Sequence, residues 1–130
     1  MKRKLFGITV LVVLAISLLG TPSCARSQKL VSVTLQPSGG FVFEGFDAKG
    51  QFVALGTYIH PPETKDISSK VDWKIDIGNF GTIDSTGLIT YTRTDGCGSG
   101  NVTATFTSGD SVMIGSAPVK GVNDATAACR

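Results

Sequence analysis

Three cysteines and a single histidine are the residues of this 130-residue chain best suited to nucleophilic or metal chemistry. His60 precedes two prolines at the end of a predicted strand, and a lone histidine in such a place is a poor candidate for a general base. The cysteines lack the C-x-x-C spacing of a zinc site. We therefore expect no catalytic residue, no cofactor and no metal site, and we interpret the chain as a protein that is not an enzyme.

Acidic pairs and a glycine-rich segment are the other candidates for chemistry. Asp72 and Asp76 share one face of a predicted strand. Paired carboxylates can hydrolyse glycosides or bind calcium, but they more often form the solvated face of an antiparallel sheet, and we adopt that interpretation. The segment 95–100 has the glycines of a phosphate-binding loop, yet no helix or lysine follows where such a loop needs them. We expect a loop there, bridged through Cys97.

Phe41, Phe43 and Phe46 are the remaining candidates for a binding surface. They follow Pro37 in a segment flanked by glycines. Strand alternation should bury some of them, and one or two left exposed would form a patch that contacts a ligand.

Residues 1–23 have the pattern of an export signal. Lys2, Arg3 and Lys4 precede a run over residues 5–19 that is almost wholly apolar. This run is shorter than the roughly 20 residues of a membrane-spanning helix. An uncleaved anchor is the alternative. Both interpretations place the rest of the chain outside the cytoplasm, in the cell envelope or the medium.

Cys24 lies directly after the apolar run, at the position of the lipidated first residue of a bacterial lipoprotein. Lipidation would also remove the odd thiol among three cysteines in an oxidising compartment. The preceding Thr-Pro-Ser departs from the lipoprotein pattern, and Ser23 with Ala25 also suits cleavage after Ala25. We expect cleavage before Cys24 and a lipid anchor there, with cleavage after Ala25 as the alternative. A lipid anchor would then be the only membrane contact.

The charge of the exported part is close to zero. The chain has 12 Lys and Arg against 10 Asp and Glu. Removal of the three cations that precede the apolar run leaves 9 against 10, a net charge of −1. A nucleic-acid-binding protein needs a basic surface, so this balance argues against such a partner.

From residue 30 onward, apolar and polar residues alternate between frequent turn residues. The clearest strand is predicted over 71–77, where Val71, Trp73, Ile75 and Ile77 face one side. Other strands are predicted over 31–35, 51–59, 80–83, 88–92, 102–106 and 111–119. About seven short strands in a hundred residues predict an all-β antiparallel sandwich. We expect a linker over 24–29, one domain over 30–120 and a tail over 121–130. The core should centre on Trp73, Phe52, Ile75, Phe106 and Leu88.

The order of these motifs resembles the bacterial Ig-like domain of group 2. The matching features are an alternating strand that ends in Pro37, the Val71-Asp72-Trp73 strand, the turn before Gly87, and a glycine followed by the alternating residues 101–106. The resemblance implies an immunoglobulin-like β-sandwich without catalytic machinery. Domains of that family are modules of adhesins, surface-layer proteins and polysaccharide-active enzymes, and some bind glycans or host surfaces. They are usually joined to other domains, whereas this chain contains a single copy.

Cys97 and Cys129 form the predicted disulfide. Cys97 precedes the strand over 102–106 and Cys129 follows the last strand. If these two strands form a hairpin around Ser108 and Gly109, their outer ends lie at the same pole of the sandwich. A bridge would tether the tail, and two free thiols are the alternative.

These observations together predict an exported, non-catalytic module for cell-surface or envelope binding and adhesion. A glycan or an envelope protein would be its partner. The alternative is a structural spacer or accessory subunit of an envelope complex, with no ligand of its own.

Overall fold

The computed structural model describes residues 27–94 and 96–123, and apart from one short 3₁₀ turn their regular elements are all β-strands. The predicted all-β antiparallel sandwich is confirmed, although it divides into more strands than the seven expected. No helix in the described ranges is long and apolar enough to cross a membrane. The elements are β1 (Lys29–Gln36), β2 (Phe41–Glu44), β3 (Lys49–Gln51), β4 (Val53–Ile59), β5 (Glu63–Asp66), the 3₁₀ turn η1 (Ser68–Lys70), β6 (Asp72–Ile75), β7 (Gly81–Ile83), β8 (Leu88–Tyr91), β9 (Cys97–Ser108) and β10 (Ser111–Val122).

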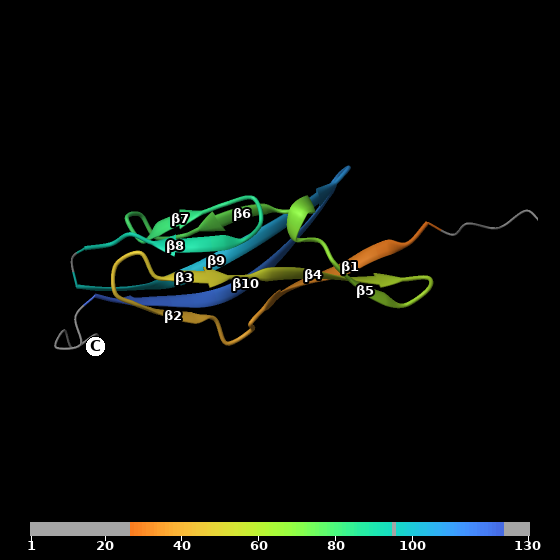
Figure 1. The fold of residues 1–130 in the computed structure, drawn as a ribbon. Helices are drawn as coiled ribbons and strands as arrows, with labels where there is room; N and C mark the ends of the chain where they lie inside the picture. The colour runs from red at the N-terminus through yellow and green to blue at the C-terminus, as the bar shows by residue number, and fades with distance from the viewer. Residues whose placement is uncertain (1–26, 95, 124–130) are drawn as a thin grey trace, which may run out of the picture.

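The strands form two layers. One layer contains β1–β4–β5 and β3–β8–β7, and the other is β2–β10–β9–β6. The first two sheets are continuous because β3 and β4 are separated only by Phe52, whose N–H donates to Gly87 O at 2.9 Å. With β3 and β4 taken as one strand, the layers follow the A-B-E-D and G-F-C order of an immunoglobulin-like sandwich. Figure 1 shows β9 and β10 as the long blue strands that extend along the molecule.

The chain changes layer between β1 and β2. β1 pairs antiparallel with β4, whereas β2 pairs parallel with β10. Pro37 ends β1, as the sequence predicts, because proline has no N–H to continue the ladder. The four residues of β2 were not predicted as a strand. Their pairing depends on β10, almost 80 positions later in the chain, and a local pattern cannot reveal it.

Most of the glycine-rich segment is strand and not loop, which corrects the expectation for residues 95–100. Cys97 through Gly100 belong to β9 and pair with β10 as far as Val122. A Cβ on Gly100 would lie 2.1 Å from Ile77 Cγ1 and 2.5 Å from Asp76 Oδ1. Because glycine has no side chain, neighbouring side chains can pack directly against the backbone of β9 here. The predicted hairpin at Ser108 and Gly109 is confirmed, and it brings the outer ends of β9 and β10 to one pole.

A β-bulge changes which residues of β1 point inward. The register with β4 shifts between Leu30 and Ser32. As a result Leu30 is buried and Val31 is 42% exposed, although simple alternation predicts the reverse. Val33 and Leu35, beyond the bulge, are buried as expected.

The core is an aromatic cluster and is not centred on Trp73, which corrects a second expectation. Phe43, Phe52, Phe80 and Tyr91 are all at most 2% exposed, and the rings of Phe80 and Tyr91 lie 4.9 Å apart. Trp73 is only half-buried because β6 is an edge strand, and its indole N–H donates to Ser68 O at 3.0 Å. The other residues expected at the centre, Ile75, Leu88 and Phe106, are likewise half-buried.

Candidate functional site

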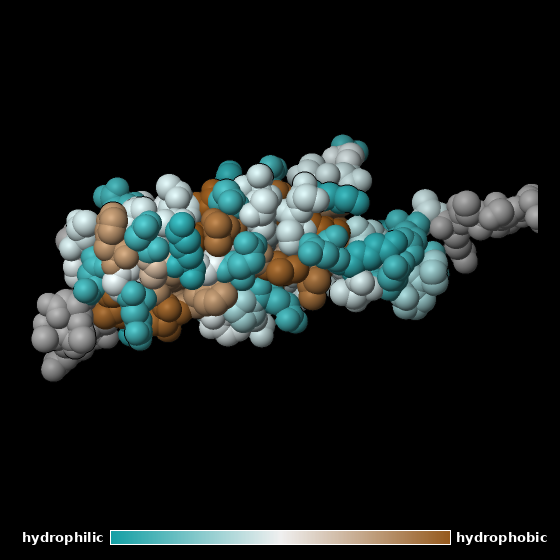
Figure 2. Space-filling view, viewed as in Figure 1, coloured by the Kyte–Doolittle hydropathy of each residue, from teal (hydrophilic) through white to brown (hydrophobic). Residues whose placement is uncertain are grey.

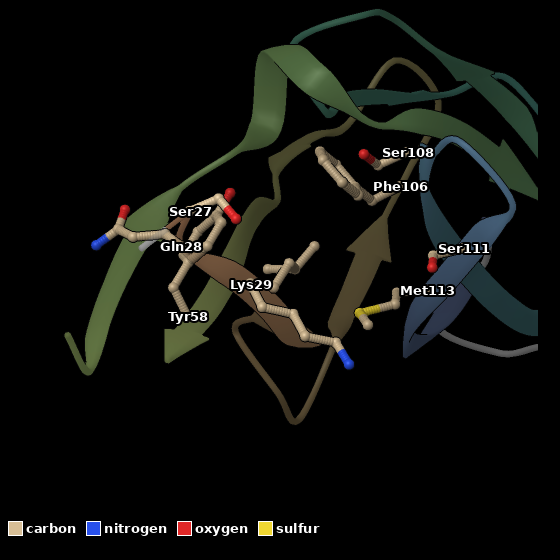
Figure 3. A pocket seen from close by; sticks show the side chains of 9 residues that line it. Ser27, Gln28, Lys29, Tyr58, Phe106, Ser108, Ser111 and Met113 are labelled. Carbon is tan, nitrogen blue, oxygen red and sulfur yellow. The ribbon is translucent and has the colours of Figure 1, made fainter. Parts of the chain in front are cut away.

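One end of the sandwich contains an open cavity of about 310 Å³. It lies between the start of β1, the end of β4 and the tip of the β9–β10 hairpin, so the two layers contribute opposite walls (Figure 3). A cavity of this size with mixed lining is the usual form of a small-ligand site. The lining residues are Ser27, Gln28, Lys29, Leu30, Tyr58, Phe106, Ser108, Ser111 and Met113.

The apolar walls are two cross-strand pairs, one from each layer. Leu30 lies directly opposite Tyr58 in the β1–β4 pairing, and Phe106 lies directly opposite Met113 in the β9–β10 pairing. Leu30 is buried, while the other three side chains are half-buried and pack against the core. Directly opposed residues in an antiparallel pair have neighbouring side chains, so each wall is fixed by strand register. The cavity thus offers two aromatic rings whose surfaces are partly accessible.

The polar lining consists mainly of uncharged hydrogen-bonding groups. Ser108 and Ser111 flank the hairpin turn, and Tyr58 carries a phenol hydroxyl. In the described part of the chain, Lys29 is the only lining residue with a formal charge. Figure 3 shows its side chain extending from the β1 side of the cavity. The lining therefore combines hydroxyl groups, an amide and one ammonium with the aromatic walls.

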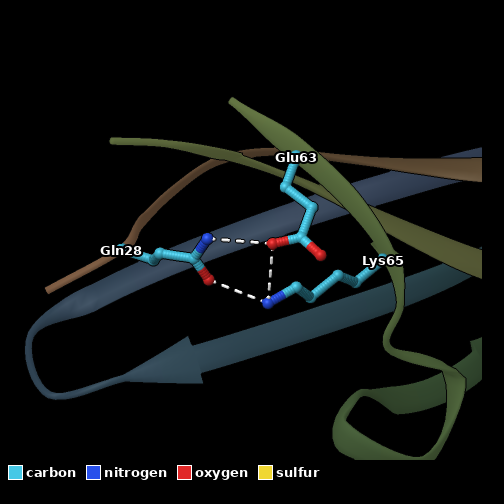
Figure 4. A network of polar contacts seen from close by, with 3 residues as sticks. All are labelled: Gln28, Glu63 and Lys65. Atoms are coloured by element: carbon cyan, nitrogen blue, oxygen red, sulfur yellow. Dashed lines mark hydrogen bonds and ion pairs between the residues drawn. The ribbon is translucent and has the colours of Figure 1, made fainter. Parts of the chain in front are cut away.

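Gln28 is held in position by a small network next to the cavity (Figure 4). Its amide nitrogen donates to Glu63 Oε2 at 2.9 Å, and its amide oxygen accepts from Lys65 Nζ at 2.9 Å. Lys65 also forms an ion pair with Glu63 at 2.9 Å. The hydrogen bond from Gln28, and then that from Lys65, lower the pKa of the Glu63 carboxyl below its ordinary value.

The same network extends to Tyr58. Lys65 Nζ lies 5.6 Å from the centre of the Tyr58 ring, within the range of a cation–π contact. Both Glu63 and Lys65 are more than 40% exposed, so their ion pair contributes little to stability. Its effect is positional, because it orients Gln28 and Tyr58 at the cavity edge. Figure 2 shows this end of the molecule as a mostly hydrophilic surface, in agreement with the exposure of all four β5 residues.

The three phenylalanines proposed as a binding surface differ in their exposure to solvent. Phe43 is 2% exposed, which excludes it from any surface. Phe41 is half-buried, with its ring 5.0 Å from that of Phe52. Phe46 is 62% exposed. Alternation in β2 explains the burial of Phe43, whereas Phe46 lies in the following turn.

The turn that carries Phe46 is fixed by its neighbours on both sides. Gly45 N donates to Val122 O and Asp47 N donates to Tyr91 O, both at 2.8 Å. Gly45 and Asp47 have positive φ values, which Asp tolerates better than most residues. Phe46 is therefore a well-positioned exposed aromatic, but it does not line the cavity between the two layers.

The cysteine predictions are only partly within the described residues. Cys97 is disulfide-bonded. Cys24 and Cys129 lie outside the described ranges, as does the signal segment, so the pairing with Cys129 and the lipidation of Cys24 stay predictions. The first residue of β9, Cys97, pairs with Val122 of β10. The register therefore places Val122, near the start of the predicted tail, beside Cys97.

Asp76, one of the acidic pair considered in the sequence, and Asp84 both accept hydrogen bonds that hold local structure. Asp76 accepts hydrogen bonds from Asn101 N at 2.7 Å and Asn101 Nδ2 at 3.0 Å. Asp84 accepts from Thr86 and Leu88 in the turn before β8, where Gly87 has a positive φ. These bonds lower the pKa of both carboxyls. Within the described ranges no three His, Cys, Asp or Glu residues come together as a metal site.

The residues that line the cavity were largely missed by sequence reasoning. Phe106 was expected in the core, and Met113 was given no role. Each lies in a strand with ordinary alternation, so no local signal separates it from a core residue. Only the divergence of the two layers at this end creates the cavity.

Comparison with known proteins finds no family model that matches this chain and no curated protein that is similar in sequence. The geometry of the site is therefore the basis for the functional argument.

Proposed function

We propose that this protein is an exported, non-catalytic immunoglobulin-like module that binds glycans at the cell surface or in the envelope. The observation that supports the proposal is the cavity between the two layers. Its aromatic rings, Tyr58 and Phe106, suit the apolar faces of a sugar ring, and its serines suit the hydroxyls. Its volume of about 310 Å³ is small and favours one or two sugar units over an extended chain.

Export remains part of this proposal. It rests on the pattern of residues 1–23 and on the three cysteines, which suit an oxidising compartment. We propose further that Cys24 carries a lipid and that the protein stays in the envelope. Intact-mass measurement of the protein from its membrane fraction tests this, because diacylation adds a defined mass to a chain that begins at Cys24. A mature chain that begins at Arg26 would contradict it.

We also propose membership of the group 2 bacterial Ig-like family. The strand order of the two layers and the position of Trp73 on β6, the strand equivalent to strand C, support this assignment. The proposed absence of catalysis rests on the family resemblance and on the roles of Asp76 and Asp84 in local structure.

A glycan array with three versions of the protein tests the proposed function. The wild type should bind a subset of glycans above background. Tyr58→Ser should lose this binding, because it removes one aromatic wall, while Phe46→Ser should retain it. Thermal melting establishes that each variant is folded before the array is read. Binding that survives Tyr58→Ser and disappears with Phe46→Ser would place the site on the β2–β3 turn and refute the proposed cavity.

A structural spacer is the second candidate, and one observation favours it. The described chain starts and ends at opposite ends of an elongated sandwich (Figure 1). Such an arrangement suits a spacer, because whatever is attached at one end is kept a full domain length from the other end. A wild-type protein that binds no glycan above background would favour the spacer.

A further inference from the structure

The charge of the cavity selects among glycans. Among the described residues that line the cavity, Lys29 is the single charged one and none carries a carboxylate. Within the described ranges no ion pair forms with Lys29, whereas the nearby Lys65 is matched by Glu63 at 2.9 Å. The cavity therefore presents one uncompensated positive charge.

From this we infer that the cavity binds an acidic saccharide, such as a hexuronic acid, through Lys29. This inference rests on the proposed glycan-binding function and assigns the ligand class of the same site. The sugar ring lies between the walls formed by Tyr58 and Phe106, and its carboxylate accepts a charge-assisted hydrogen bond from the Lys29 ammonium. Ser108 and Ser111 bond to ring hydroxyls.

The uncharged lining distinguishes a sugar from a fatty acid. A fatty acid also has one carboxylate, but its chain offers nothing to hydroxyl groups. Ser108, Ser111 and the Tyr58 hydroxyl would then lose hydrogen bonds to water without replacement, which is unfavourable. A polyhydroxylated ligand replaces those bonds.

Glu63 and Asp110 lie near the cavity in the described part of the chain, and neither cancels this charge. Glu63 is bound to Gln28 and Lys65. Asp110 lies in the exposed turn between Ser108 and Ser111 and does not line the cavity. An acidic ligand therefore enters beside one free ammonium.

The test compares two ligands that differ only at C6. Methyl β-glucuronide carries a carboxylate where methyl β-glucoside carries a hydroxymethyl group. Each is titrated into the ¹⁵N-labelled full chain, kept in a detergent without a sugar headgroup, and amide shifts report both the affinity and the place of binding. We expect shifts at Lys29, Tyr58, Phe106 and Met113. The glucuronide should bind about three- to tenfold more tightly than the glucoside, and this difference should shrink as salt is added.

The variants Lys29→Gln and Lys49→Gln assign the preference to one side chain. Both variants lose one positive charge. Lys49 is the control because it lies on β3 and does not line the cavity. Lys29→Gln should bring the two affinities together, and Lys49→Gln should leave the preference intact. Equal affinities in the wild type, or a preference that survives Lys29→Gln, would overturn the inference and leave the glycan-binding function standing. Hexanoate is titrated in the same way as a fatty-acid probe. A wild type in which neither sugar shifts the cavity amides, or in which only hexanoate does so, would overturn both the inference and the glycan-binding function.

Discussion

Gly121 of β10 offers the sharpest test of how the two layers pack. A Cβ at this position would lie 2.1 Å from Cε2 and 2.4 Å from Cζ of Tyr91. The Tyr91 ring is wholly buried and packs against Phe80 at 4.9 Å and Phe43 at 6.1 Å, so it has little room to move. Excess volume in a well-packed core costs about 1–3 kcal/mol. We expect Gly121→Ala to lower the free energy of unfolding by about 3 kcal/mol, the upper end of that range, because the overlap is severe.

Urea unfolding followed by the fluorescence of Trp73 measures this change, since Trp73 is the only tryptophan. Gly39→Ala is the matched control, because nothing lies within 4 Å of a Cβ there. It should change stability by no more than about 0.5 kcal/mol. In an ordinary strand, alanine is more stable than glycine by about 0.5–1 kcal/mol. A Gly121→Ala protein as stable as the wild type would therefore refute the packing of β10 on Tyr91.

A double-mutant cycle separates the clash from other effects. Tyr91→Ala alone should cost about 3–5 kcal/mol through the cavity that it leaves. In the Gly121→Ala background the same substitution also removes the clash, so it should cost less by about 1–3 kcal/mol. Additive effects would show that the two residues do not touch.

Individual contacts support three further predictions. Tyr91 Oη is buried without a hydrogen-bond partner in the described part of the chain. Tyr91→Phe should therefore leave the free energy of unfolding unchanged or raise it by up to about 1 kcal/mol. Urea titration measures this change, and a clear loss of stability would reveal a partner for the hydroxyl. Phe43→Ala should cost about 3–5 kcal/mol and Phe46→Ala less than about 0.5, by thermal melting; comparable losses would contradict their 2% and 62% exposures. Hydrogen bonds from the backbone and side chain of Asn101 hold the pKa of Asp76 in the folded protein below its ordinary value of 3.8. The ionised Asp76 therefore stabilises the fold fully above pH 3.8, and this stabilisation is lost as the pH falls through the lower pKa of the folded state. The wild type should thus lose more stability than Asp76→Asn between about pH 5 and pH 3, and equal losses in the two urea series would argue against this role.

Local sequence patterns identify most strands, because alternation and turn residues act over a few positions. The end of β1 at Pro37, the turn before Gly87 and the hairpin at Ser108 and Gly109 are all readable in this way. The patterns fail where a strand depends on a distant partner. β2 forms through its parallel pairing with β10, and the bulge in β1 turns Val31 outward.

The candidate site shows the same division between local and distant effects. The sequence suggests that some of Phe41, Phe43 and Phe46 are exposed, but it does not say which. Burial of Phe43 follows from the contact of β2 with the core, and exposure of Phe46 follows from the turn after it. Tyr58 and Phe106 become walls of one cavity only because β4 and β9, which belong to different layers, come together at the same end of the sandwich.

By itself, the sequence determined the fold class, the near-neutral charge of the part after the signal pattern, and the positions of many strand ends. These properties depend on composition and on the period of two between side chains of one face. The tertiary structure decided the aromatic core around Tyr91, the edge position of Trp73, and the cavity beside Lys29. Each of these depends on which strands become neighbours, and that choice reflects the packing of side chains far apart in the chain.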